Sequence, residues 1–185
     1  MKSHIARLLN AIRNILLFKL RYRWVIYGKD VHVQWSTHIW SPHKLVHLGN
    51  HVGIGRYCDI STDLFVGNHV LIASAVAFLA RDAHTPSVLG TTMFDAPRGD
   101  KYRIVIEDDV WIGYGAIILS GVRVGRGSVV GAGAIITKDL PPYSVTVSQP
   151  SEVIRGRFTQ DEIQVHEAAL RCQHVIDDSL PGEQA

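Results

Sequence analysis

A six-residue period runs through two long blocks of this chain and constrains its fold more than any other feature of the sequence. A period of six fits neither an α-helix, with about 3.6 residues per turn, nor a strand that alternates between two faces. It suits a short strand followed by a turn, so that three such units close one triangular coil. The first residue of each unit is aliphatic or Phe throughout: Leu48, Ile54, Ile60, Val66, Ile72 and Phe78, then Ile106, Ile112, Ile118, Val124, Val130 and Ile136.

These first-position side chains are predicted to point inward, with stacked coils pairing as parallel strands about 4.8 Å apart. Fifth positions other than Asp82 are small or apolar as well, so the Cys58 thiol is expected to pack in the interior rather than react. Glycines at second and fourth positions, such as Gly113 and Gly115, permit corner backbone angles that a Cβ would penalise. The sequence therefore predicts an all-β fold, a parallel β-helix over residues 31–157.

A weaker copy of the period lies upstream, in Val33, Ile39 and Leu45, and slips by three residues before Leu48. We expect the first coil there. His51 and His69 are one coil apart in the repeat, and their rings are predicted to stack at exposed corners.

The N-terminal segment, residues 1–30, is predicted to contain a basic amphipathic helix over residues 3–23. One interpretation is that this helix covers an open end of the fold or packs on a partner subunit, and the other is peripheral contact with an anionic membrane surface. No stretch reaches the roughly eighteen apolar residues that a spanning helix needs. Its apolar side holds Ile5, Leu8, Leu9, Ile12, Ile15 and Leu16, with Arg7, Arg13, Lys19, Arg21 and Arg23 around them.

The C-terminal segment, residues 158–185, is predicted to be a helix followed by a short tail. Thr159 and Glu162 have the spacing of a capping box, which marks the start of a helix. Ile163, His166, Leu170 and Val175 then supply an apolar stripe.

Composition narrows the class of function. Lys and Arg number 19 against 17 Asp and Glu, so the chain lacks the concentrated basicity of a nucleic-acid-binding protein. Its two cysteines, Cys58 and Cys172, do not form a disulfide scaffold and suggest reduced thiols. We expect a cytoplasmic protein, or one peripheral to the inner face of the membrane.

The period stops between Phe78 and Ile106, which predicts a loop over residues 79–105. Departures from a regular repeat usually map to loops that carry function. His84 lies early in this excursion, within the run Ala83-His84-Thr85-Pro86.

Residues 45–157 resemble the hexapeptide-repeat acyltransferases, and among them the galactoside, maltose and polysaccharide O-acetyltransferases. The resemblance rests on the six-residue period, on His84 in the interrupting loop, and on the segments Asp109–Gly113 and Val130–Pro142. It implies a left-handed coil and a homotrimer with active sites in clefts between subunits. It also implies acetyl-CoA as the acyl donor, a small-molecule or glycan acceptor, and no metal.

The resemblance assigns roles to individual residues. His84 would be the general base that removes the proton of the acceptor hydroxyl, because imidazole titrates near neutral pH. Asp82 either orients that imidazole or ends the coil, and Trp111 either lines the acceptor or cofactor cleft or contacts another subunit. The acetyl-CoA site would contain Gly113, Tyr114, Ala132, Thr137, Lys138 and Arg155.

These assignments predict acetyl transfer from acetyl-CoA to a sugar hydroxyl in surface polysaccharide assembly. The main alternative is N-acetylation of an amino sugar on a nucleotide carrier. Two other classes stay open: a zinc hydrolase or hydratase with three His ligands at a subunit interface, and a catalytically silent scaffold. The run Val147–Ser151 departs from the Ala-Gly-x-Pro-Ala pattern of the family just before Arg155.

Overall fold

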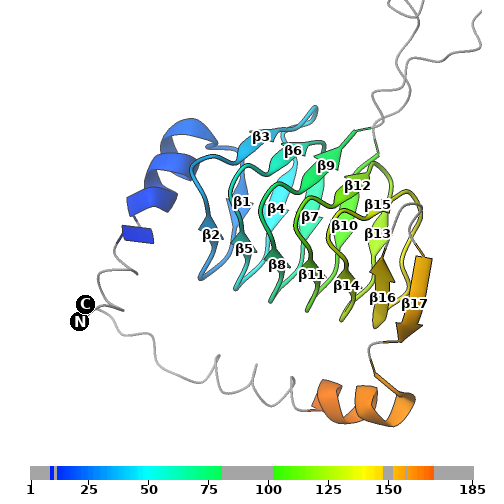
Figure 1. The fold of residues 1–185 in the computed structure, drawn as a ribbon. Coiled ribbons are helices and arrows are strands. Elements are labelled where there is room, and N and C mark those ends of the chain that lie inside the picture. Colours follow the sequence, from blue (N-terminus) through cyan, green and yellow to red (C-terminus); the bar gives the residue numbers. More distant parts are fainter. Residues whose placement is uncertain (1–8, 11, 81–101, 148–151, 157, 169–185) are drawn as a thin grey trace, which may run out of the picture.

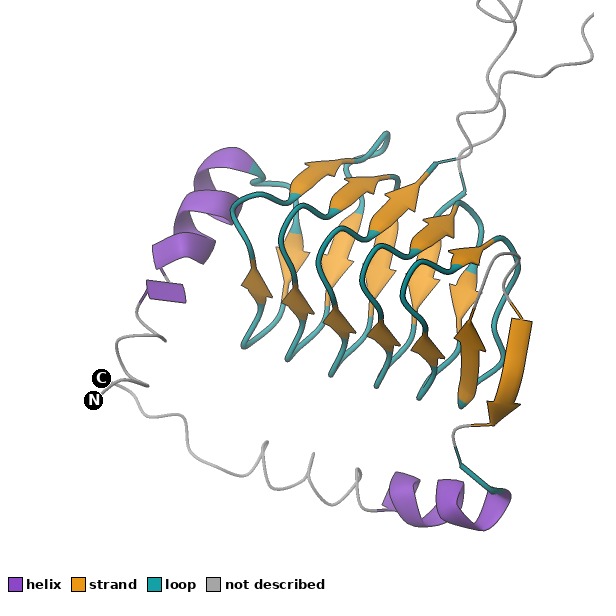
Figure 2. Ribbon diagram, in the orientation of Figure 1, coloured by secondary structure: helices purple, strands orange, loops and turns teal. Residues whose placement is uncertain are grey.

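The computed structural model describes residues 9–10, 12–80, 102–147, 152–156 and 158–168. Its central body is a parallel β-helix whose short strands stack into three walls (Figures 1 and 2). The prediction of this fold class is confirmed.

Each wall collects one strand from every coil. The first wall holds β1 (Ile26–Tyr27), β4 (Val46–Leu48), β7 (Leu64–Val66), β10 (Ile104–Ile106) and β13 (Arg123–Val124). The second wall holds β2 (His32–Val33), β5 (Gly53–Ile54), β8 (Leu71–Ile72), β11 (Trp111–Ile112), β14 (Val129–Val130), β16 (Ser144–Val147) and β17 (Glu152–Gly156). The third wall holds β3 (His38–Trp40), β6 (Asp59–Ser61), β9 (Ala77–Leu79), β12 (Ile117–Leu119) and β15 (Ile135–Ile136). Neighbouring strands are parallel except β16 and β17, which are antiparallel.

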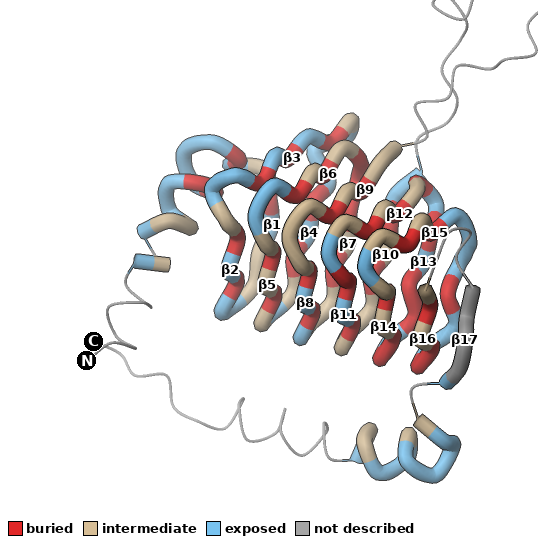
Figure 3. Tube along the Cα trace, viewed as in Figure 1, coloured by how far each residue is buried: buried red, intermediate tan, exposed pale blue. Residues whose placement is uncertain are grey.

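The interior is built from the repeat itself. All twelve first-position side chains of the two blocks are buried, none more than 5% exposed. They form columns, for example Ile60, Phe78, Ile118 and Ile136 along the third wall. Each such side chain removed from water stabilises the fold by about 1.5–3 kcal/mol. Cys58 is also buried, as predicted, and burial raises the pKa of its thiol. Figure 3 shows the resulting alternation of buried and exposed positions along each coil.

The corner glycines divide into two kinds, where the sequence predicted one. Fourth-position Gly133 has a φ of +68°, as expected of a left-handed corner. Second-position Gly113 has no positive φ; a Cβ there would lie 2.6 Å from the backbone nitrogen of Ala132 on the next coil. The expectation of special backbone angles at second positions was therefore wrong, because what requires glycine there is the close approach of stacked coils.

The first coil also differs from the prediction. Val33 and Ile39 point inward, but Leu45 is 48% exposed, and the coils begin earlier, at β1. The three residues by which the period slips are accommodated in the corner before β4. Side chains therefore point inward again at Val46 and Leu48, and not at Leu45.

The loop excursion lies between the third and first walls. β9 and β10 keep the register of their neighbours, with Leu79 beside Leu119 and Ile104 beside Leu64. Phe78 and Ile106 are 28 positions apart where the period requires six, so 22 residues are inserted at this corner. Residues 81–101, which include Asp82 and His84, lie outside the described residues.

The N-terminal helix spans 9–10 and 12–21, and its last part is the π-helix η1 (Ile15–Arg21). Leu17 and Phe18 are 1% and 2% exposed and belong to the hydrophobic core, and Phe18 stacks on Tyr27 of β1. The helix therefore covers the N-terminal end of the coils, as one interpretation predicted (Figure 1). Among the described residues, no helix has the length and apolar character needed to cross a bilayer. The residues of the predicted apolar stripe that the structure describes do not form the contact between this helix and the coils. Leu9, Ile12, Ile15 and Leu16 are all exposed.

The C-terminal helix, 160–168, begins with the predicted capping box. The Thr159 backbone N–H donates to Glu162 Oε2 over 2.8 Å, and the Glu162 N–H donates to Thr159 Oγ1 over 3.3 Å. The helix is held on the coils by His166, whose Nε2 lies 3.1 Å from Asp109 Oδ2, and by a hydrogen bond from the Tyr143 hydroxyl to Glu167. Burial and that carboxylate together raise the pKa of Tyr143 to about 12.

Candidate functional site

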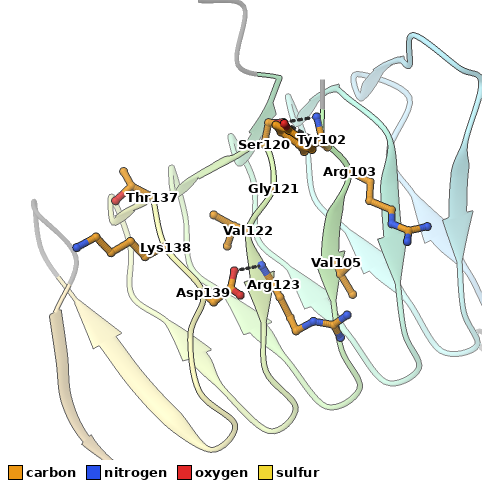
Figure 4. A pocket seen from close by; sticks show the side chains of 10 residues that line it. All are labelled: Tyr102, Arg103, Val105, Ser120, Gly121, Val122, Arg123, Thr137, Lys138 and Asp139. Carbon is orange, nitrogen blue, oxygen red and sulfur yellow. Dashed lines mark hydrogen bonds between the residues drawn. The ribbon is translucent and has the colours of Figure 1, made fainter. Parts of the chain in front are cut away.

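A groove of about 460 Å³ lies at the corner between the third and first walls, where the loop excursion returns to the coils. We call it the corner groove (Figure 4). Three successive coils build it, and their residues are one eighteen-residue turn apart, as in Tyr102, Ser120 and Lys138. Its lining consists of Tyr102, Arg103, Val105, Ser120, Gly121, Val122, Arg123, Thr137, Lys138 and Asp139.

Ser120 fixes the point where the excursion ends. Its Oγ accepts the Tyr102 N–H over 2.9 Å and lies 2.6 Å from the Tyr102 carbonyl oxygen, to which it is also placed to donate. Thr62 Oγ1 donates to the same carbonyl from the coil on the other side, over 3.3 Å. Because Tyr102 is bonded to both neighbouring coils, the end of the loop has a defined position beside the groove.

The corner groove has a positive charge balance. Among the described residues that line it, Arg103, Arg123 and Lys138 are cationic and Asp139 is the one carboxylate; Asp139 Oδ1 accepts the Arg123 backbone N–H over 2.8 Å. Arg123 Nη1 also lies 2.6 Å from Glu107 Oε1.

Glu107 therefore joins the charge network at the edge of the groove. Burial raises the pKa of its carboxyl, but hydrogen bonds from the Arg123 side chain and the Arg126 N–H outweigh this and leave the pKa below its ordinary value. Arg103 lies over the Phe65 ring, with Cζ 5.3 Å from the ring centroid. An open, cationic groove of this kind suits a ligand with phosphate groups.

The structure divides the predicted cofactor residues between two corners. Thr137 and Lys138 line the corner groove. Gly113, Tyr114 and Ala132 lie at the opposite edge of the third wall, where Gly113 N–H donates to Val130 over 2.7 Å.

Strand β15 runs between these two groups, from the corner at Ala132 to the corner at Thr137. An extended backbone rises about 3.3 Å per residue, which puts the corners on the order of 15 Å apart. A ligand touching both groups must therefore be long and must lie across the third wall.

Trp111 lies on the outer face of the second wall and is 54% exposed. It is in register with Leu71 and Val129, and Val129 with Val145, so four apolar side chains form an outward ladder. This ladder lines a hollow of about 610 Å³ together with His69, Asp109 and Val110. Trp111 is thus separate from the corner groove.

Arg155 lies in β17, where its Cα pairs with that of Val145. Its side chain lies outside the described part of the structure, as do Asp82 and His84. Of the ten groove residues, only Thr137 and Lys138 were predicted from the sequence; the polar ones that were missed are Tyr102, Arg103, Ser120, Arg123 and Asp139. The signal that finds them is the eighteen-residue spacing, because Ser120 lies one turn before Lys138 and Tyr102 one turn before Ser120.

A separate cluster of polar side chains stabilises the corner before β4. Asp63, buried on β7's N-terminal side, lies 2.5 Å from both Ser41 Oγ and His43 Nδ1. Burial raises the pKa of Asp63, but the hydrogen bonds from Ser41 and His43 outweigh this effect and leave the pKa below its ordinary value.

The predicted stacking of His51 and His69 is confirmed, with ring centroids 4.7 Å apart. Within the described ranges, no three His, Cys, Asp or Glu side chains are grouped as metal ligands would be.

Comparison with known proteins agrees with this architecture. The sequence profile of the bacterial transferase hexapeptide family, of six repeats, matches residues 103–138. A galactoside O-acetyltransferase of Lactococcus lactis is 39% identical over 113 residues, which cover 57% of this chain and 52% of that enzyme. A hexapeptide-repeat acetyltransferase of Vibrio cholerae has a crystal structure that matches with a TM-score of 0.58 and 28% identity, over 81% of this chain and 82% of that one. The chain thus contains hexapeptide repeats of the bacterial transferase type and is similar to acetyltransferases that are built from them.

The proteins to which this chain is similar differ in chemistry. The Vibrio protein has also been crystallised with acetyl coenzyme A, and that structure matches with a TM-score of 0.55 and 26% identity, over 80% of this chain and 78% of that one. A tetrahydropyridine-dicarboxylate N-acetyltransferase of Staphylococcus aureus is 49% identical over 69 residues, covering 37% of this chain and 29% of that enzyme. The matches span about half or less of these two curated relatives.

Proposed function

We propose that this protein transfers an acetyl group from acetyl-CoA to a hydroxyl of a sugar, in cytoplasmic steps of surface polysaccharide assembly. The observation that carries the proposal is the cationic corner groove, which contains Thr137 and Lys138 at the place where the loop bearing His84 rejoins the coils. A galactoside O-acetyltransferase among the relatives supports a sugar hydroxyl as the acceptor.

The groove suits the nucleotide end of the donor. Lys138 and Arg103 line the groove from its two ends, with their charged groups turned away from each other (Figure 4). Each is a suitable partner for phosphate oxygens, because charge-assisted hydrogen bonds are stronger than neutral ones. The pantetheine arm then runs along β15 across the third wall, towards Gly113 and Ala132. The structure of the Vibrio relative with acetyl coenzyme A supports this choice of donor.

His84 supplies the base in this proposal. An alcohol is a weak nucleophile at neutral pH, and imidazole is a suitable acceptor for its proton. As the proton moves to His84, the acceptor oxygen bonds to the thioester carbonyl carbon and the carbon–sulfur bond breaks. The leaving thiolate takes the proton from His84, so the products are the acetyl ester and the free thiol.

We also propose that the protein is a homotrimer, with the second wall at the contact between subunits. The outward ladder of Leu71, Trp111, Val129 and Val145 is an apolar strip on an otherwise mixed surface. Burying such a strip against another subunit gains free energy in proportion to the apolar area removed from water. A Trp111→Ser variant is expected to shift the molecule from trimer towards monomer in light scattering, whereas an unchanged mass would remove the ladder from the interface.

N-acetylation of an amino sugar is the second candidate, because the Staphylococcus relative is an N-acetyltransferase. The deciding experiment presents the purified protein with acetyl-CoA and matched pairs of sugars that differ only in one hydroxyl or amine. Release of free thiol and the mass of the acceptor are measured. Acetylation of hydroxyl sugars supports the proposal, and acetylation confined to amines replaces it with the alternative.

The base is tested with His84→Gln, for which His38→Gln is a matched control on an exposed imidazole of β3. Removing a general base is expected to lower kcat by about 10²–10⁴-fold. Equal rates in the two variants would reject His84 as the base.

A further inference from the structure

The first 29 residues carry charge of one sign only. They contain seven Lys or Arg and no Asp or Glu, and the first carboxylate of the chain is Asp30. The remaining residues hold 12 Lys or Arg against 17 Asp or Glu, so the rest of the chain is net negative although the whole chain is +2. The first 29 residues are thus a purely basic segment of the sequence. Its basic residues are Lys2, Arg7, Arg13, Lys19, Arg21, Arg23 and Lys29.

The N-terminal helix presents a fixed apolar face to solvent. Leu9, Ile12, Leu16 and Leu20 recur at spacings of three, four and four, which places them along one side of the helix. They are 61%, 46%, 37% and 69% exposed. We call these four residues the outer face. Three exposed cations, Lys19, Arg21 and Arg23, lie at its C-terminal end.

Different residues attach the helix to the coils, so the outer face is not needed for folding. Leu17 and Phe18 are buried in the core. Asn10 and Asn14 each donate a side-chain hydrogen bond to the Val31 carbonyl, over 3.2 and 2.7 Å. These contacts hold the helix along the end of the β-helix (Figure 1). The exposed side chains of the outer face are therefore turned to solvent.

We infer that the outer face binds the surface of an anionic lipid bilayer, with the helix lying in the plane of the interface. Helices of this type bury an apolar side at the boundary of head groups and acyl chains while basic residues contact anionic head groups. A second copy of the same face is a poor occupant, because it would bring two sets of cations together with no carboxylate on either helix. The inference is independent of the acetyl-transfer proposal.

The test is co-sedimentation of the full chain with vesicles of phosphatidylcholine alone and of phosphatidylcholine mixed with phosphatidylglycerol. Binding is expected only with phosphatidylglycerol, and it should weaken between about 0.1 M and about 1 M salt as the charges are screened. Absence of binding to the anionic vesicles, or equal binding to both vesicle types, would overturn the inference.

Two pairs of variants separate the apolar and the charged contributions. Lys19→Gln with Arg23→Gln is expected to weaken binding about fivefold per cation, while Lys44→Gln with Arg56→Gln removes the same charge from exposed sites elsewhere and should leave binding nearly unchanged. Leu20→Gln is expected to weaken binding about tenfold or more, and Leu45→Gln, also exposed, is its control.

Melting temperature and oligomeric mass are measured for the same variants. Both should stay at the wild-type values, because the changed side chains are exposed. Equal losses in the test and control variants would overturn the inference. So would a change of oligomeric mass in the Leu20 variant, which would assign the outer face to a protein contact.

Discussion

A Gly113→Ala substitution tests whether close coil stacking, rather than a special backbone angle, is what requires glycine at second positions. The added Cβ would lie 2.6 Å from the Ala132 nitrogen and 2.9 Å from the Val130 carbonyl oxygen. Ordinary contact begins near 3.4 Å, so the two coils must separate by about 0.8 Å. The hydrogen bond from Gly113 N–H to Val130, now 2.7 Å, would then lengthen to about 3.5 Å and be largely lost.

The expected cost follows from these two effects. Overpacking of a tight interior costs about 1–3 kcal/mol, and the lost hydrogen bond about 1 kcal/mol. We expect Gly113→Ala to lower the free energy of unfolding by about 2–4 kcal/mol. Gly133→Ala is the matched control, because its φ of +68° is strained for alanine but no atom lies within 4 Å of the added Cβ. Strain of this kind costs about 1–2 kcal/mol, part of which is offset by lower entropy of the unfolded chain.

Urea unfolding followed by circular dichroism measures both variants. The unfolding midpoint of Gly113→Ala should fall clearly below that of Gly133→Ala. An equal or smaller loss for Gly113→Ala would refute the reasoning, since the coils would then have room for a methyl group. The same variant is expected to raise the KM for acetyl-CoA if the proposed pantetheine path at this corner is correct.

Three further results are expected. Asp63→Asn should reduce the loss of stability on acidification: the folded-state pKa of Asp63 is lowered, so its contribution is present above its unfolded value of about 3.9 and is lost as pH falls through the folded pKa. Melting temperature as a function of pH measures this, and an unchanged acid limb would contradict it. Ala75→Gly should raise stability by up to about 1 kcal/mol, because Ala75 has a φ of 60° at the corner stacked on Gly115; a lower denaturant midpoint would show that strain is absent there. Lys138→Ala should raise the KM for acetyl-CoA about fivefold with kcat unchanged, as expected for an exposed charge contact, and an unchanged KM would place the donor phosphates elsewhere.

The candidate site was only partly predictable. Thr137 and Lys138 were assigned from the resemblance, and both line the corner groove. Arg103 was not, because it lies where the period is interrupted, and Ser120 was not, because its partner comes from that interruption. Ser120 becomes a neighbour of Tyr102 only because the inserted residues end in register with the coil. A repeat predicts which residues stack, but an insertion of unknown extent hides which residue resumes the stack.

The sequence by itself determined the coil. Any side chain at the first position of a six-residue unit returns to the same inward direction, so the period alone places Ile118 and Ile136 in the interior and in one column. Only the tertiary structure decided how the N-terminal helix is used. Its periodicity identifies apolar residues, but periodicity does not say which of them meets the core. The contacts of Leu17 and Phe18 with the first coil made that choice and left Leu9 and Leu20 in solvent.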